Sequence, residues 1–275
     1  METNMDYEKY RGWLAKPGWE LWAPGCYTDY VESPVNNERL SVSVNIVHEH
    51  RFAFLYWATF FQKYFIKKKY PFASKPILIS LDYHDDVGAD SDCEASVLES
   101  LDISNKTELT MFCWSYLRSL NDGHILPALY LDMFSDVYIL NTEPDTGQDR
   151  TYLDRNKNEH SIKYFNDERI IVAALETVTA PIYLDIDLDF FTKYEDPSGV
   201  IGSSKMIPTE DIEYILRLKN PLMSRIYPNL IGLTIATEVH HCGGYRNSMR
   251  ILDILNNEFF SGSLMSDSAK WNSDT

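Results

Sequence analysis

The 275-residue sequence lacks the features that mark membrane-spanning or exported proteins. Its four cysteines show no Cys-x-x-Cys spacing, and this usage is typical of free thiols in a reducing compartment. No apolar run reaches the length of a membrane span, and the first ten residues are too polar for a signal peptide. We therefore expect a cytoplasmic protein without a membrane partner.

Positive charge is also scarce. The chain has 25 Lys and Arg residues against 41 Asp and Glu residues, which gives a formal net charge of −16. This balance disfavours nucleic acid as a partner and suits a cationic substrate. No internal repeat is visible, and the length favours one large domain. The sequence leaves the oligomeric state open, a homo-oligomer included.

Apolar strands alternate with helical patterns along the chain. Strands are expected over about 40–47, 77–81, 137–140, 181–191 and 229–237, and helices over about 52–68, 108–120, 125–133, 167–178, from 208 onward and 246–260. This alternation predicts an α/β fold of three layers, α/β/α, with a mostly parallel sheet. We expect a single domain over residues 1–260, with an irregular aromatic-rich segment over 1–38 packed on it. Residues 85–94, 141–160 and 192–207 are expected to be loops, and 261–275 a disordered tail.

The stretch 181–191 carries three aspartates at alternate positions, Asp185, Asp187 and Asp189. Successive side chains of a strand point to opposite faces, so the three carboxylates share one face at a spacing of about 7 Å. They repel one another in a dry sheet. We therefore expect the strand to end at water or at a cation that neutralises them.

A second alternating set, Asp82, His84 and Asp86, follows the apolar run 77–81. An imidazole between carboxylates at the exit of a buried strand is a ligand set for manganese, iron or zinc. Ligands of open α/β sheets bind outside the carboxyl ends of the strands, so we expect both sets to meet there.

Four strand ends in all carry polar clusters, namely His48/His50, Asp82/His84/Asp86, Asp185/Asp187/Asp189 and Glu238/His240/His241. In this order they resemble the arginase–agmatinase ureohydrolase superfamily. The likeness lies in the step Glu49-His50, the Asp-x-His-x-Asp motif from Asp82, the pair Asp187-x-Asp189 and Glu238. It is closest to the divergent peptide arginase branch, which converts arginine side chains of ribosomally made peptides to ornithine.

The resemblance implies an α/β/α fold with two Mn²⁺ ions per chain. One ion would take His50, Asp82, Asp86 and Asp187, and the other Asp82, His84, Asp187 and Asp189. A hydroxide bridging the ions would attack the guanidinium of an arginine in a peptide and release urea. The chain lacks the Gly-Gly before the first His, the Asp-Pro after the Asp-x-Asp pair and the residues for a free α-amino acid. These departures disfavour free arginine as substrate.

Catalytic roles follow from the same comparison. Glu238 can pair with the planar guanidinium. The leaving amine needs a proton, for which His124 is the first choice, while His240 and His241 compete and are expected near the substrate.

Several alternatives stay open. His48 can replace His50 as a ligand, and Asp185 can replace Asp189. The chain can instead be a ureohydrolase of a free guanidino compound, a deacetylase-like amidohydrolase, or a non-catalytic peptide-binding module that contains metal.

Overall fold

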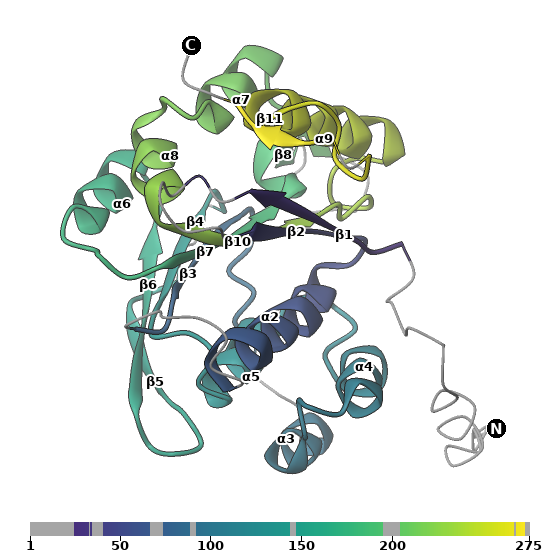
Figure 1. The fold of residues 1–275 in the computed structure, drawn as a ribbon, viewed down its shortest axis with the longest axis vertical. Coiled ribbons are helices and arrows are strands. Elements are labelled where there is room, and N and C mark those ends of the chain that lie inside the picture. The colour runs from purple at the N-terminus through teal and green to yellow at the C-terminus, as the bar shows by residue number, and fades with distance from the viewer. Residues whose placement is uncertain are drawn as a thin grey trace.

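The computed structural model describes residues 25–32, 34, 41–66, 74–88, 92–143, 147–194, 204–266 and 268–272. Its centre is an eight-stranded sheet of order β1-β2-β10-β7-β3-β4-β6-β5 (Figure 1). The inner strands run parallel: β2 (Ser41–Val47), β10 (Leu230–Ala236), β7 (Ile182–Asp187), β3 (Ile77–Asp82), β4 (Val137–Asn141) and β6 (Glu159–Phe165). The edge strands β1 (Tyr27–Glu32) and β5 (Arg150–Leu153) are antiparallel to their neighbours. The expected mostly parallel sheet is confirmed.

Helices cover both faces of the sheet (Figure 1). One face carries α2 (Ala53–Phe61), which continues as the π-helical turn η2 (Gln62–Ile66), together with α3 (Asp92–Ser100), α4 (Lys106–Ser115) and α5 (Ile125–Tyr130). The other face carries α6 (Glu168–Leu175), α7 (Thr209–Leu216), α8 (Pro221–Ile226) and α9 (Tyr245–Phe259). Short 3₁₀ turns are η1 (His50–Phe52), η3 (Leu188–Phe191) and η4 (Tyr227–Asn229). None of the described helices is long and apolar enough to cross a membrane.

The central strands are buried on both faces, which is why they read as nearly continuous apolar runs. Along β3, Leu78 packs into the core beneath α2, whereas Ile77 and Ile79 pack into the core on the other face. This alternation follows from the pleat of a strand. Each face of the sheet therefore has its own apolar core, as three layers require.

A close fit between neighbouring strands fixes the part of the sheet that carries the polar clusters. A Cβ atom on Gly232 of β10 would lie 2.2 Å from the Tyr183 ring of β7. The Tyr183 hydroxyl accepts hydrogen bonds from Asn45 Nδ2 at 3.0 Å and Thr234 Oγ1 at 3.2 Å. One buried phenol thus joins β2, β7 and β10.

Several expected loops contain regular structure. Residues 27–32 of the segment expected to be irregular form β1, while residues 1–24 lie outside the described part of the chain. The polar stretch 141–160 forms β5 and the start of β6, and α3 begins within the acidic loop expected over 85–94. An edge hairpin and an outer helix expose many side chains, so their composition resembles that of a loop.

The last residues also differ from the expectation. Strand β8 (Thr192–Tyr194) pairs with β9 (Ser204–Met206) inside the expected loop 192–207. Strand β11 (Phe260–Ser261) pairs with β12 (Lys270–Trp271), and the Trp271 ring packs 4.6 Å from the Phe260 ring. The described residues up to 272 are therefore not the disordered tail expected over 261–275. The Trp271 ring and hydrogen bonds from Asn272 Nδ2 to the carbonyls of Asn257 and Glu258 hold this Ser/Asp-rich stretch against the end of α9.

None of the four cysteines, all of which lie in the described part of the chain, forms a disulfide, as their spacing predicts. Cys26, Cys113 and Cys242 are buried, and Cys93 is exposed. Burial raises the pKa of Cys26 to about 11 and raises the pKa of Cys113 and Cys242 as well. These three thiols stay protonated at neutral pH and act as small apolar groups.

Candidate metal centre

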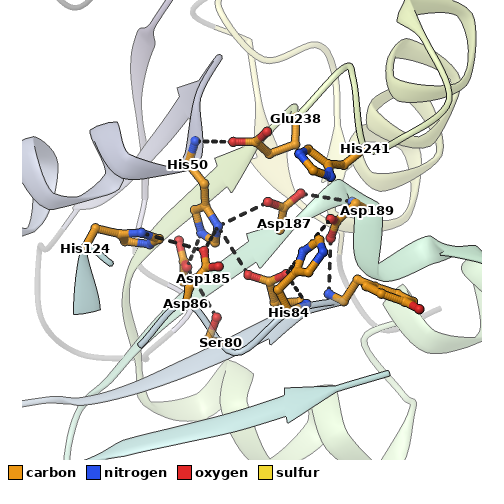
Figure 2. A network of polar contacts seen from close by, with 12 residues as sticks. His50, Ser80, His84, Asp86, His124, Asp185, Asp187, Asp189, Glu238 and His241 are labelled. Atoms are coloured by element: carbon orange, nitrogen blue, oxygen red, sulfur yellow. Dashed lines mark hydrogen bonds and ion pairs between the residues drawn. The ribbon is translucent and has the colours of Figure 1, made fainter. Parts of the chain in front are cut away.

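Buried His and Asp side chains gather at the carboxyl edge of the sheet (Figure 2). Four neighbouring parallel strands, β2, β10, β7 and β3, end there. His50 follows β2, Asp82 ends β3, Asp187 ends β7 and Glu238 follows β10. The structure therefore brings together clusters that lie far apart in the sequence.

His50 lies at the middle of this gathering. Its Nδ1 atom is 2.8 Å from Asp86 Oδ2, 3.1 Å from Asp187 Oδ2 and 3.3 Å from Asp82 Oδ2. Its Nε2 atom is 2.7 Å from Asp185 Oδ2. One ring nitrogen thus faces three carboxylates while a fourth carboxylate holds the other, an arrangement found where a carboxylate orients a metal-binding histidine.

A second group of ligand atoms surrounds His84. Its Nδ1 atom is 3.2 Å from Asp189 Oδ2 and 3.8 Å from Asp82 Oδ1. The His241 ring lies 5.3 Å from the His84 ring, and the nearest ligand atoms of His84, Asp189 and His241 lie within 4.8 Å of one another. Because the other oxygen of Asp82 faces His50, Asp82 spans the two groups.

The ionisation of Asp82 fits this bridging place. Burial by itself raises the pKa of Asp82, but the contacts with His50 and His84 outweigh burial and lower the pKa to about 2. The carboxylate therefore stays ionised at neutral pH and offers one oxygen to each group.

Backbone hydrogen bonds fix the carboxylates. The backbone N–H of His84 donates to Asp82 Oδ1 at 2.8 Å, that of Tyr83 to Asp189 Oδ1 at 3.1 Å, and that of Asp189 to Asp187 Oδ1 at 3.0 Å. In each case one oxygen accepts from the backbone. For Asp187 and Asp189 the other oxygen remains turned toward a histidine. The strand ends thus hold the ligand atoms in place.

The carboxylates of the cluster repel one another, and this repulsion changes their pKa values. Burial and the neighbouring Asp82 raise the pKa of Asp86 well above its ordinary value, and burial and Asp189 do the same for Asp187. Burial by itself lowers the pKa of His84, but Asp189 outweighs it and raises that pKa to about 10. A divalent cation among these groups would relieve the repulsion between the carboxylates.

Several of these candidate ligand atoms make no hydrogen bond within the described residues. His50 Nδ1, Asp82 Oδ2 and Asp189 Oδ2 are buried and make no hydrogen bond there, although each lies 2.8–3.3 Å from an oppositely charged group. Buried polar atoms ordinarily have one, since an unmade hydrogen bond is costly. Imidazole and carboxylate ligands without thiolate suit divalent ions such as manganese and iron. These buried His and Asp groups can hold metal ions.

The structure distinguishes the alternatives that the sequence left open, His48 or His50 and Asp185 or Asp189. His48 is half-buried, and its ring stacks 6.3 Å from the Tyr245 ring rather than among the carboxylates. Asp185 contacts the outer nitrogen of His50, and Asp189 contacts His84. The geometry therefore favours His50 and Asp189 as ligands and gives Asp185 an orienting place.

His124 lies deep in the cluster. Its side chain is fully buried, its ring is 4.3 Å from the His50 ring, and its Nδ1 atom is 3.7 Å from Asp86 Oδ2. Burial and the charge of His50 lower its pKa well below the ordinary value. Figure 2 shows His124 and His241 on opposite sides of the cluster. The ligand atoms of His124, His50 and Asp86 thus form one close group, on the side of the cluster away from His241.

Glu238 lies at the rim, only 6% exposed and at a φ of 27°, a conformation that non-glycine residues seldom adopt. Its Oε1 atom accepts a hydrogen bond of 2.6 Å from the His50 backbone N–H. Burial raises the pKa of Glu238 to about 7, although the His50 N–H opposes this effect. The carboxylate is therefore held next to the ligands in a poorly solvated place.

The two histidines after Glu238 differ. His241 is half-buried and belongs to the group around His84. His240 is exposed, and none of the groups of close ligand atoms found among the described residues includes it. A turn in which the His241 N–H donates to the Glu238 carbonyl directs the two side chains differently. The expectation that His240 lines the substrate site gains no support.

Tyr194 belongs to the site although the sequence did not single it out. Its hydroxyl lies 3.0 Å from His241 Nδ1, and its ring lies 4.7 Å from the Tyr83 ring. Tyr194 ends β8, inside a stretch expected to be a loop. Only the folded hairpin brings it to the rim, and no local sequence signal indicates that.

Comparisons with known proteins add no assignment. No model of a known protein family matches the chain. A search of curated proteins gives no match either. The likeness to the ureohydrolases thus rests on the residues themselves, and the function is inferred from how the fold arranges them.

Proposed function

We propose that this chain is a metal-dependent hydrolase that converts arginine side chains in a peptide to ornithine and releases urea. The proposal rests on two groups of ligand atoms, around His50 and His84, that share Asp82 beside a buried carboxylate, Glu238. We propose Mn²⁺ for both positions because the ligands are oxygen and imidazole. One ion would be held by His50, Asp82, Asp86 and Asp187, and the other by Asp82, His84, Asp187 and Asp189.

Divalent ions held here would lower the pKa of water and so supply a nucleophile near neutral pH. In the balanced reaction the water oxygen bonds to the guanidinium carbon. The bond from that carbon to the side-chain nitrogen then breaks, and the nitrogen takes a proton. Urea and the ornithine amine are the products. The task of the protein is to place the guanidinium and to deliver that proton.

Glu238 is suited to bind the guanidinium. A planar fork of N–H donors pairs with a carboxylate through charge-assisted hydrogen bonds. The His50 backbone N–H fixes one oxygen of Glu238, so the side chain is already oriented beside the ligands. Burial raises its pKa to about 7, and the charge of a guanidinium beside it would oppose this effect and favour the ionised form.

His241 is suited to carry the proton for the leaving amine. It is half-buried at the rim, and its Nδ1 atom pairs with the Tyr194 hydroxyl, which leaves Nε2 for the substrate. Burial lowers its pKa below the ordinary value. His124 is fully buried against His50 and Asp86, so we assign the proton transfer to His241 in preference to His124.

Two observations lead us to propose a peptide as the substrate. A cavity of about 720 Å³ is lined by His48 and Thr237, from the strand ends that also carry the ligands, and by the exposed Tyr27 and Tyr245. None of its lining residues is a proposed metal ligand, so in this proposal it would hold residues that flank the arginine. The net charge of −16 favours a cationic chain.

The direct test incubates Mn²⁺-loaded protein with arginine-containing peptides and weighs the products. Each converted arginine lowers the mass by about 42 units, the difference between guanidine and amine. We expect Glu238→Gln to keep its manganese and to lose at least about 100-fold in turnover. Asp211→Asn, an exposed change of the same kind on α7, is the matched control and should keep full turnover.

The outcomes separate the candidate functions. Turnover of free arginine or agmatine, but of no peptide, would replace the peptide arginase by a ureohydrolase of free guanidino compounds. Absence of urea from every peptide and guanidino compound, in protein shown to contain manganese, would refute the hydrolase.

A further inference from the structure

Asp132, Asp154 and His160 form a separate group of ligand atoms. It lies at the amino ends of the parallel strands, away from the groups around His50 and His84. Asp132 follows α5, Asp154 follows β5, and His160 is the second residue of β6. Strand β6 runs parallel to β4, and β4 runs parallel to β3. The start of β6 therefore lies at the amino ends of the parallel strands, whereas Asp82 lies at their carboxyl ends. Figure 1 shows the β5–β6 hairpin beside α5.

His160 is the central member of this group. The side chain is 4% exposed, and its Nδ1 atom lies 2.8 Å from the Ser135 carbonyl oxygen. A carbonyl only accepts, so Nδ1 carries the hydrogen, and Nε2 of the neutral ring carries a lone pair. This Nε2 atom is buried and has no hydrogen-bond partner among the described residues.

The buried nitrogen is aimed at two carboxylate oxygens. His160 Nε2 lies 3.7 Å from Asp132 Oδ1 and 3.6 Å from Asp154 Oδ2. Both separations are too long for a hydrogen bond. Two atoms that each lie about 2.1 Å from a zinc ion and subtend about 110–120° are about 3.4–3.6 Å apart. The observed separations, 3.6 and 3.7 Å, lie at or just above the top of this range.

The surrounding structure holds the ligands in place. Asp154 Oδ1 accepts from the backbone N–H groups of Asn156 at 2.7 Å and Asn158 at 2.8 Å. Oδ2 accepts from Asn158 Nδ2 at 2.8 Å and lies 3.6 Å from His160 Nε2, so this oxygen can still offer a second lone pair to a cation. The Ser135 carbonyl fixes the orientation of the His160 ring, as outer partners of metal-binding histidines do.

The charges nearby leave room for a cation. Lys75 forms an ion pair with Asp132 through Oδ2, so Oδ1 remains directed at His160. In the competing arrangement a protonated His160 would donate to a carboxylate within about 3.2 Å. Neither Asp132 nor Asp154 lies that close.

We propose that Asp132, Asp154 and His160 bind one divalent cation of the zinc type, with water completing its coordination. An imidazole ligand beside two carboxylates favours Zn²⁺ over Ca²⁺ and Mg²⁺. The ion ties the end of α5 to the β5–β6 hairpin. This site is independent of the hydrolase proposal, because it shares no residue with the centre around His50 and His84.

The test titrates Zn²⁺ by calorimetry into a full chain that carries Asp82→Ala and Asp187→Ala, which remove ligands of the other centre. One equivalent of Zn²⁺ should bind. Adding His160→Gln should weaken this binding at least tenfold, whereas adding Asp211→Asn should leave it unchanged. No binding to the parent, or equal binding with and without His160→Gln, overturns the proposal.

A second measurement tests the proposal if the parent with Asp82→Ala and Asp187→Ala fails to fold. The intact chain and its His160→Gln variant are loaded with Zn²⁺, freed of excess metal and analysed for zinc. The intact chain should contain one more zinc per chain than the variant. Equal zinc content overturns the proposal.

Discussion

Asparagine at position 185 would remove a charge from beside the metal ligands without removing a ligand. Asp185 Oδ2 lies 2.7 Å from His50 Nε2, and both side chains are at most 1% exposed. The amide oxygen of an asparagine can still accept from this nitrogen, but the bond is then no longer charge-assisted. Ser80 Oγ, the other partner of Asp185, is 3.5 Å away and offers little compensation. The ring of His50 is then held less firmly toward Asp82, Asp86 and Asp187.

The size of the effect follows from this contact. A hydrogen bond to a charged group contributes about 1.5–3 kcal/mol. Loss of the outer partner of a metal-binding histidine lowers metal affinity about 10–100-fold. That range equals about 1.4–2.8 kcal/mol, so the two figures agree. Asp187→Asn removes a proposed ligand of both ions and should lower the affinity further.

Mn²⁺ titration followed by the paramagnetic resonance of the free ion measures these affinities. Asp185→Asn should weaken binding about 10–100-fold, Asp187→Asn should weaken it more, and Asp211→Asn should match the wild type. Wild-type affinity in Asp185→Asn would show that this contact does not position His50. A loss as complete as in Asp187→Asn would show that Asp185 is itself a ligand.

Three further predictions concern stability. Chelation of metal should lower the melting temperature, and Mn²⁺ at 100 times its dissociation constant should restore about 2.7 kcal/mol of stability; an unchanged melting curve would contradict a metal centre. Gly232→Ala should cost about 1–3 kcal/mol in urea denaturation, because the new Cβ would meet the Tyr183 ring at 2.2 Å. Trp271→Ala should cost about 1–2 kcal/mol, less than a fully buried aromatic, because Trp271 is half-buried against Phe259 and Phe260. Unaltered urea midpoints in these two variants would mean that the strand contact and the end of the chain are not packed as described.

The convergence of the strand ends could be predicted because two simple rules apply. Alternation placed Asp185 and Asp187 on one face of a strand, and parallel strands deliver their carboxyl ends to one edge. The division of roles could not be predicted from these rules. Strand β7 ends at Asp187, and the 3₁₀ turn η3 directs Asp189 to His84, whereas Asp185 remains within the strand beneath His50.

The same limit applies at the other strand ends. His48 and His50 look equivalent as long as the strand continues, but β2 stops at Val47 and a 3₁₀ turn begins at His50. Likewise, the turn after β10 separates His240 from His241. These choices depend on how the chain leaves a strand, which tertiary contacts decide.

The β5–β6 hairpin was missed for a different reason. Strand β5 is the edge strand of the sheet and most of its side chains are exposed, so no apolar alternation is required there. Pairing with β4, rather than local preference, makes this stretch a strand. The group formed by Asp132, Asp154 and His160 depends on that pairing and is therefore invisible in the sequence.

Anomalous scattering from Mn²⁺-soaked crystals tests the metal centre most directly. Measured at the manganese edge, the map should contain two peaks in the cluster, one beside His50 and one beside His84, with Asp82 between them. A map without peaks there, or with manganese only at other places in the chain, would contradict the account.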